Sequence, residues 1–148
     1  MRRNKKELKE PTLINRTRVH VRFSETDAMG VVWHGNYLKF FEDGREAFGR
    51  EFGLSYTTIY ENGYTAPVVD IHCQFKQSLT FGDTIIIETS YHACQAAKLQ
   101  FTYTVLRERD GLIMATGQST QVFLNSSNKL ELVNPVFLKE WKENLKIL

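Results

Sequence analysis

The spacing of hydrophobic and polar residues changes once along the chain, near residue 63. Before that point, residues 17–23 alternate between apolar and polar, which predicts a strand with one solvent-exposed face. Residues 36–52 instead repeat apolar side chains at three- and four-residue steps, which predicts an amphipathic helix. Residues 24–35 carry neither pattern, so we expect a loop that joins the strand to the helix.

After residue 63 the pattern is typical of strands. Apolar runs with alternation predict four strands, over residues 64–79, 84–93, 99–107 and 112–124. Turn residues such as Asp110-Gly111 separate these runs. After Pro135 the apolar residues return to helical spacing, which predicts a short C-terminal amphipathic helix.

This order of elements predicts an α+β fold with a single antiparallel sheet. The long helix has one rich apolar stripe and only one sheet to bury it, so we expect about five strands to curl around a central helix. Gly44 lies in the middle of the stripe, where glycine costs roughly 1 kcal/mol relative to alanine, which indicates very close packing there. The outer face of the sheet would still be partly apolar, which favours a homo-oligomer, either a dimer or a tetramer.

Length and composition narrow the class of protein. A chain of 148 residues predicts one domain over residues 1–148, of which 1–12 form a flexible basic tail. A net charge of +2 gives no indication of a nucleic-acid partner, and no apolar run is long enough to cross a membrane. There is no secretory signal, and we expect Cys73 and Cys94 to be reduced core thiols, so the sequence predicts a cytoplasmic protein.

The candidate chemistry is concentrated where the first strand gives way to the helix. Residues 23–37 read FSETDAMGVVWHGNY. Asp27 is the only acid inside the loop proper, and Asn36 is a good N-cap for the helix that follows. The start of that helix presents unpaired N–H groups and the positive end of its dipole. A carboxylate therefore stands close in sequence to a group of backbone donors.

This stretch resembles the signature of hotdog-fold acyl-CoA thioesterases of the 4-hydroxybenzoyl-CoA thioesterase and YbgC type. The matching elements are Thr-Asp-x-x-Gly-Val-Val, an aromatic residue, His, and then Asn-Tyr at the start of the helix. Residues 66–69 and 79–83 also look like that family, and the resemblance covers roughly residues 16–125. It implies a hotdog fold and hydrolysis of an acyl-CoA to a carboxylic acid and CoA, without a cofactor or a metal.

The resemblance also implies roles for residues. Asp27 would be the catalytic carboxylate, as general base or nucleophile, and the backbone amide of His34 would polarise the thioester carbonyl. The His34 side chain is a second catalytic candidate, because the YbgC branch has a His here, thought to orient substrate or water, where the other branch has Tyr. The residues expected to bind substrate are Gly30, Val31, Trp33, Gly35, Asn36 and Tyr37. These groups supply the base and the oxyanion donors that thioester hydrolysis requires.

Other polar residues have simpler interpretations. Glu42 and Glu46 lie four positions apart on the helix and are typical of a solvated face. Asp70 and His72 face the same way on a predicted strand, and we expect them at an exposed or interface position rather than in a catalytic dyad. The phosphates of CoA favour basic residues at the mouth of the site, for which the sequence offers Lys76, Lys98, Arg107 and Arg109.

Several alternatives stay open. The acyl group could be alkyl, hydroxybenzoyl or dihydroxynaphthoyl, because an aromatic-rich stripe suits each of them. The acyl donor could be an acyl carrier protein instead of CoA. The same groove could also belong to a non-catalytic acyl-CoA sensor, although Asp27 argues against that class. A hotdog hydratase is disfavoured, because no His accompanies the acids on the helix.

Overall fold

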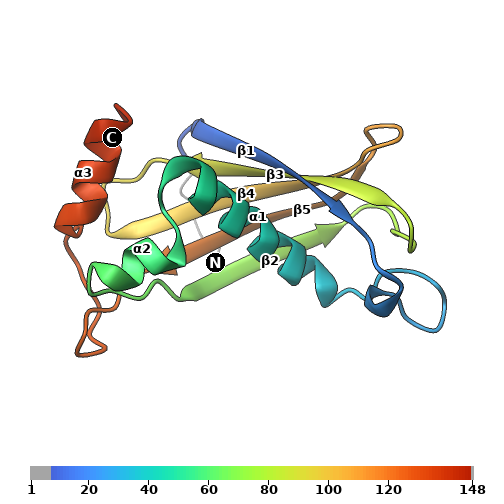
Figure 1. Cartoon of the computed structure of the whole chain (residues 1–148), viewed down its shortest axis with the longest axis horizontal. Helices are drawn as coiled ribbons and strands as arrows, with labels where there is room; N and C mark the ends of the chain where they lie inside the picture. The colour runs from blue at the N-terminus through green and yellow to red at the C-terminus, as the bar shows by residue number, and fades with distance from the viewer. Residues whose placement is uncertain (1–7, 148) are drawn as a thin grey trace, which may run out of the picture.

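The computed structural model describes residues 8–147, which fold into one antiparallel sheet, one long helix and two shorter helices. Figure 1 shows α1 lying lengthwise across one face of the sheet. Along the chain the elements are β1 (Pro11–His20), the 3-10 turn η1 (Phe23–Glu25), α1 (Asn36–Phe52), α2 (Tyr56–Glu61), β2 (Val68–Phe75), β3 (Thr84–His92), β4 (Lys98–Arg107), β5 (Ile113–Val122) and α3 (Val136–Asn144). The predicted α+β architecture with a central helix is confirmed.

The sheet has five strands in the order β1-β3-β4-β5-β2, and every neighbouring pair is antiparallel. Strands β3, β4 and β5 follow one another through short turns. The outer places go to strands that come earlier in the chain, since β1 pairs with β3 and β2 pairs with β5. Both β1 and β2 are therefore edge strands, each with one side unpaired within the chain.

The core lies between α1 and the concave face of the sheet. Phe40 and Phe41 on α1 are both 0% exposed, and the Phe48 ring lies 5.0 Å from that of Phe101 on β4, centroid to centroid. Burying an aromatic or aliphatic side chain of this size contributes roughly 1.5–3 kcal/mol. The apolar stripe predicted from the sequence is the surface that holds α1 on the sheet.

Gly44 is where the helix comes closest to the sheet. A Cβ atom at this position would lie 2.9 Å from Cγ2 of Ile87 and would also clash with Oγ1 of Thr89, both on β3. No larger residue fits unless the helix moves away from the strand. The predicted close approach at Gly44 is confirmed.

The boundaries differ from the predictions in three places. β1 spans Pro11–His20 and not residues 17–23 as predicted, so Pro11 and Thr12 belong to a strand and not to the basic tail, and Phe23 belongs to η1; residues 1–7 of that tail lie outside the described residues. The second predicted strand is shortened to β2 because its pairing with β5 covers only Val68–Phe75. The sequence pattern also missed α2, a short helix whose N-cap Ser55 accepts a hydrogen bond from the Thr58 amide at 3.2 Å.

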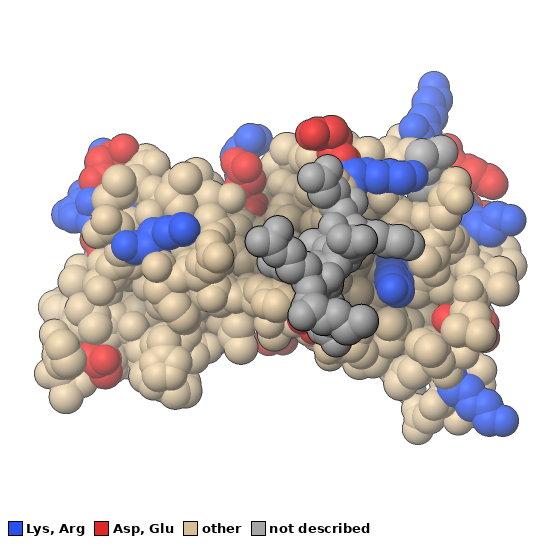
Figure 2. Space-filling model, turned by 180° about the vertical axis from the view of Figure 1, so that it is seen from behind, with Lys and Arg blue, Asp and Glu red and all other residues tan. Residues whose placement is uncertain are grey.

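The face of the sheet opposite α1 is more polar than expected. Charged side chains are sparse across it in Figure 2. Two ion pairs, Arg16–Glu88 at 3.0 Å and Arg18–Glu108 at 2.8 Å, link β1 to β3 and to the turn that follows β4. Most side chains that alternate with the core residues on β4 and β5 are hydroxyls or amides: Gln100, Thr102, Thr104, Thr116, Gln118 and Thr120. This face therefore supports the predicted oligomer less than the free edge of β2 does.

Cys73 and Cys94 are both free thiols. Each is half-buried, so they lie at the margin of the core and not inside it. No helix of the described residues is long and apolar enough to cross a membrane.

Candidate active site

The loop after β1 is folded into a tight hairpin that carries Asp27 to the surface. Thr26 and Val32 pair as an antiparallel bridge, and the Asp27 amide donates to the Val31 carbonyl at 2.8 Å. The Gly30 amide donates back to the Asp27 carbonyl at 3.0 Å, and Gly30 has φ of +79°, a conformation that favours glycine. Gly30 therefore serves the turn that places Asp27, and it does not line the cleft described below.

The Asp27 carboxylate is exposed and held by one hydrogen bond. Its Oδ1 accepts from the Met29 amide at 2.8 Å, which fixes the side chain as an Asx turn. Within residues 8–147 no Lys, Arg or His lies at ion-pair distance from it. Oδ2 is therefore free to take a proton from water or to attack an electrophile.

The Asn36 side chain holds the start of α1 in place but does not cap the helix. Gly35 is the N-cap, so the predicted capping role of Asn36 is wrong. Asn36 Nδ2 instead donates at 2.8 Å to the carbonyl of Glu25, which also accepts from the Trp33 amide at 3.0 Å. This bond ties the first residue of the helix to η1.

Two backbone donors at this helix start have no partner among the described residues. The N–H groups of His34 and Gly35 make no hydrogen bond there, whereas those of Asn36 and Tyr37 donate to the carbonyls of Trp33 and His34. Unpaired N–H groups at a helix N-terminus attract negative charge. They can stabilise an oxyanion that forms on a thioester carbonyl.

Asp27 and the start of α1 border one open cleft of about 490 Å³. It is lined by Asp27, Val31, Val32, His34, Tyr37, Phe75, Lys76, Gln77 and Ser78. Four of the residues predicted from the sequence are thus brought together: Asp27, His34, Val31 and Tyr37. Trp33, Gly35 and Asn36 do not line it; the Trp33 ring covers Gly35 and lies 5.0 Å from the His34 ring.

The opposite wall comes from the end of β2 and the segment that follows it, of which the sequence analysis had named only Lys76 as a candidate. Val31 pairs with Thr80, and the Val32 amide donates to the Leu79 carbonyl at 2.8 Å, so the hairpin is fastened to this segment. Phe75, Gln77 and Ser78 enter the cleft for that reason. Besides the candidate Lys76, the family-like segment at residues 79–83 was the sequence signal for this wall.

Two aromatic rings form an apolar part of the cleft. The rings of Tyr37 and Phe75 meet edge to face with centroids 5.0 Å apart. Burial raises the pKa of Tyr37, and burial likewise raises the pKa of the Cys73 thiol, so both stay neutral at neutral pH. This aromatic surface suits an acyl group, with Asp27 and Lys76 supplying charge elsewhere in the cleft.

The remaining polar candidates lie elsewhere. The Asp70 and His72 side chains are 3.2 Å apart but 61% and 65% exposed, so they form no buried dyad. Glu46 pairs with Arg50 at 3.1 Å on the solvated face of α1. Of the four basic candidates for CoA phosphates, Lys76 alone lines the cleft. Residues 8–147 contain no cluster of three or more His, Cys, Asp or Glu side chains arranged to hold a metal ion.

Comparison with known proteins places this geometry in a family. Residues 21–141 match the thioesterase-like superfamily. The chain belongs to this superfamily. It is 34% identical over 92 residues to the putative acyl-CoA thioesterase YneP of Bacillus subtilis, covering 62% of this chain and 67% of that protein. It is 30% identical over 99 residues to the acyl-CoA thioesterase YbgC of Haemophilus influenzae, covering 66% of this chain and 73% of that protein.

The chain also shares its fold with solved structures. The DHNA-CoA thioesterase from Staphylococcus aureus superposes with a TM-score of 0.81 at 25% identity, over 90% of this chain and 89% of that chain. The predicted hotdog fold is confirmed, and so is the predicted reaction class, thioester hydrolysis.

Proposed function

We propose that this chain hydrolyses acyl-CoA thioesters in the cleft at the start of α1, with Asp27 as the catalytic carboxylate. The observation that carries the proposal is the meeting of three features in one place. An exposed carboxylate with a free oxygen, the unpaired backbone N–H of His34 and the aromatic rings of Tyr37 and Phe75 border the same cleft, and the unpaired N–H of Gly35 follows that of His34 in the chain. A thioester carbonyl set between Asp27 and the N–H groups of His34 and Gly35 would find a base or nucleophile on one side and oxyanion donors on the other.

The chemistry then follows from those positions. As general base, Asp27 takes a proton from water while the water oxygen bonds to the acyl carbon. As nucleophile, its free oxygen bonds to the acyl carbon and water later opens the anhydride. In both cases the carbon–sulfur bond breaks, the CoA thiolate takes up a proton, and the acyl group leaves as a carboxylic acid. The His34 side chain lines the cleft and is proposed to orient substrate or water.

The substrate is proposed from the walls of the cleft. Tyr37 and Phe75 give an aromatic surface, with the two rings edge to face, that suits an aryl or an alkyl group. Lys76 is the proposed contact for a CoA phosphate, because its ammonium can reach an anion at the rim. The names of the relatives, acyl-CoA and DHNA-CoA thioesterases, support CoA as the donor. They leave both aryl and alkyl groups open as the acyl part of the substrate.

We also propose a cytoplasmic homo-oligomer whose first contact is β2. This edge strand has an unpaired row of backbone groups and carries exposed Val69 and Phe75, at 59% and 53%. Self-pairing across a two-fold axis would satisfy those groups in both copies. A tetramer would need a second contact, for which the polar outer face is the remaining large surface.

A panel of thioesters tests the activity. Thiol release is followed with alkyl-CoAs of several lengths, hydroxybenzoyl-CoA and dihydroxynaphthoyl-CoA, and with the same acyl groups on acyl carrier protein. We expect release from at least one CoA class. Release only from the carrier protein would replace CoA as the donor. Binding of acyl-CoA without any release would contradict the enzyme and favour a sensor.

A further inference from the structure

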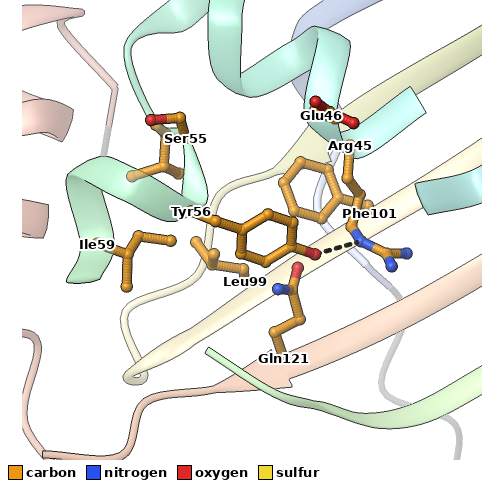
Figure 3. Close-up of a pocket in the computed structure, with 9 residues that line it drawn as sticks. Arg45, Glu46, Ser55, Tyr56, Ile59, Leu99, Phe101 and Gln121 are labelled. Atoms are coloured by element: carbon orange, nitrogen blue, oxygen red, sulfur yellow. Dashed lines mark hydrogen bonds between the residues drawn. The ribbon is translucent and has the colours of Figure 1, made fainter. Parts of the chain in front are cut away.

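A second, smaller pocket lies at the other half of α1. It has a volume of about 30 Å³ and sits between α1, α2 and the strands β4 and β5 (Figure 3). Its residues are Arg45, Glu46, Leu54, Ser55, Tyr56, Ile59, Leu99, Phe101 and Gln121. None of them lines the catalytic cleft. Most of the wall is aliphatic or aromatic, so the few polar atoms that face it determine what it can bind.

Arg45 places a cation in this wall without a carboxylate partner. Its Nη1 donates to the Tyr103 hydroxyl at 2.9 Å and its Nε to the Tyr56 hydroxyl at 3.3 Å. Within the described residues no acid pairs with it, and Glu46 at the mouth is engaged by Arg50. Burial lowers the pKa of Arg45, but the two tyrosine hydroxyls more than offset this, so the guanidinium stays charged.

Gln121, in contrast, has a hydrogen-bond acceptor without a donor. Gln121 is 2% exposed, and its side-chain Nε2 donates to the Ala66 carbonyl at 2.8 Å. Its Oε1 is buried and has no hydrogen-bond partner. Figure 3 shows this amide below the Tyr56 hydroxyl, on the same side of the pocket. A buried acceptor without a donor costs about 1–3 kcal/mol, so this atom calls for a ligand that donates a proton.

One chemical group satisfies both sides of the pocket. A hydroxyl can accept from the Tyr56 or Arg45 donors and donate to Gln121 Oε1 at the same time. A carboxylate has no proton to give Gln121, and a methyl group leaves both sides unpaired. The volume of about 30 Å³ is enough for a group of the size of a water molecule or a hydroxyl.

The pocket and the cleft of one chain share no lining residue and lie at different positions along α1. Phe41 lies between Tyr37 and Arg45 in the helix, is 0% exposed, and stacks on Tyr103 with ring centroids 4.5 Å apart, so packed aromatic rings fill the stretch between the two sites. The cleft lies at the Phe75 end of β2, whereas Gln121 is the register partner of Val68 at the other end. Antiparallel self-pairing of β2 would bring the cleft end of one copy beside the pocket end of the other.

We infer that this pocket binds the terminal hydroxyl of an acyl chain held in the catalytic cleft of a second copy. The inference rests on the proposed function and on the β2-paired dimer. It makes Gln121, Tyr56 and Arg45 specificity-determining residues for chains that end in a hydroxyl.

Matched acyl-CoA pairs test this selectivity. Decanoyl-, dodecanoyl- and tetradecanoyl-CoA are each compared with the ω-hydroxy form of the same length. We expect kcat/KM to favour the hydroxylated member by about tenfold at one length, and Gln121→Met to abolish the preference. Gln118→Met, on the outer face of the same strand, is the control and should keep it. Equal rates at every length would mean that the pocket holds water only, and would overturn the inference.

A binding arm separates this failure from failure of the proposed function. The Asp27→Asn variant is titrated calorimetrically with the same pairs. If wild type releases no thiol but binding still favours the hydroxyl, the enzyme proposal fails and the pocket stands; equal binding overturns the pocket. Tyr56→Phe, at a residue 44% exposed, repeats the test if Gln121→Met does not fold.

Mixed dimers test the contribution of the second copy. A dimer is assembled from one Asp27→Asn chain and one Gln121→Met chain, so that its only active cleft is on the Gln121→Met chain. We expect the hydroxyl preference to persist, because that cleft faces the intact pocket of its partner. Loss of the preference would place the pocket in the same chain as the cleft and overturn the assignment.

Discussion

The first turn of α1 and its middle are built in opposite ways. Around the first turn, Asp27 and His34 are exposed, Trp33 is 51% exposed, and two backbone N–H groups have no partner among the described residues. In the middle, Gly44 touches β3 without room for a methyl group and Phe48 is 1% exposed. The same helix thus has a solvent-exposed end, where backbone N–H groups lack hydrogen-bond partners, and a tightly packed centre.

This contrast predicts that activity and stability can be changed separately. Residues of the exposed end make few contacts, so changing them should cost little folding free energy. Residues of the centre hold the helix on the sheet, so changing them should unfold the chain without altering the chemistry of the molecules that stay folded. The following substitutions probe that separation.

The largest effect on stability is expected for Gly44→Leu. The added side chain would clash with Ile87 and Thr89, and overpacking of this kind should cost about 3 kcal/mol. Urea unfolding followed by circular dichroism measures it. Glu42→Leu, on the exposed face of the same helix, is the control and should change the free energy of unfolding by no more than about 0.5 kcal/mol. Equal losses would remove the distinction between the two faces.

Asn36→Ala should affect both properties. Loss of its hydrogen bond to the Glu25 carbonyl should cost about 1 kcal/mol of stability. It should also lower kcat by about tenfold, because the N–H groups of His34 and Gly35 lose their anchor. Asn62→Ala removes a similar bond, to the Thr58 carbonyl in α2. This control should lose stability alone; an unchanged kcat in Asn36→Ala would rule out the positioning role.

Lys76→Gln should change binding and leave chemistry intact. Removing the only one of the four basic candidates that lines the cleft should raise KM for acyl-CoA by about threefold to tenfold, with kcat unchanged. The difference from wild type should shrink as salt is added. Lys98→Gln, at the start of β4 away from the cleft, should have the wild-type KM. A shift shared by both variants would indicate a general effect of charge.

The smallest effect is expected for His34→Ala. The proposed oxyanion donor at this position is the backbone N–H, which alanine keeps. Steady-state rates should therefore stay within about tenfold of wild type, the loss reflecting only the orienting role of the side chain. A loss of a hundredfold or more would move the catalytic role from the backbone to the imidazole.

The sequence predicted local features well. The helix over residues 36–52 and the placing of Asp27 beside a helix start depend on residues near one another in the chain. The close approach at Gly44 is made to β3, but a glycine inside an apolar helical stripe is a local sign of it. The early start of β1 was missed because residues 11–16 gain their strand conformation from pairing with β3, more than seventy residues later. Such pairing leaves no periodic signal at the residues themselves.

The far wall of the site was missed for the same reason. Gln77 and Ser78 reach the cleft because the hairpin is bonded to the segment after β2, a contact between distant parts of the chain. Asn36 was assigned to the helix cap because Asn is common there, whereas its side chain bonds to Glu25, eleven positions earlier. Tertiary hydrogen bonds decided both cases.

The most direct measurement compares wild type with Asp27→Asn on the best acyl-CoA of the panel. The substitution keeps the size of the side chain and an oxygen that can accept from the Met29 amide, so the free energy of unfolding should change by no more than about 0.5 kcal/mol. Thiol release should fall by about a thousandfold while acyl-CoA binding is retained. Release near the wild-type rate from the folded variant would contradict a catalytic role for Asp27.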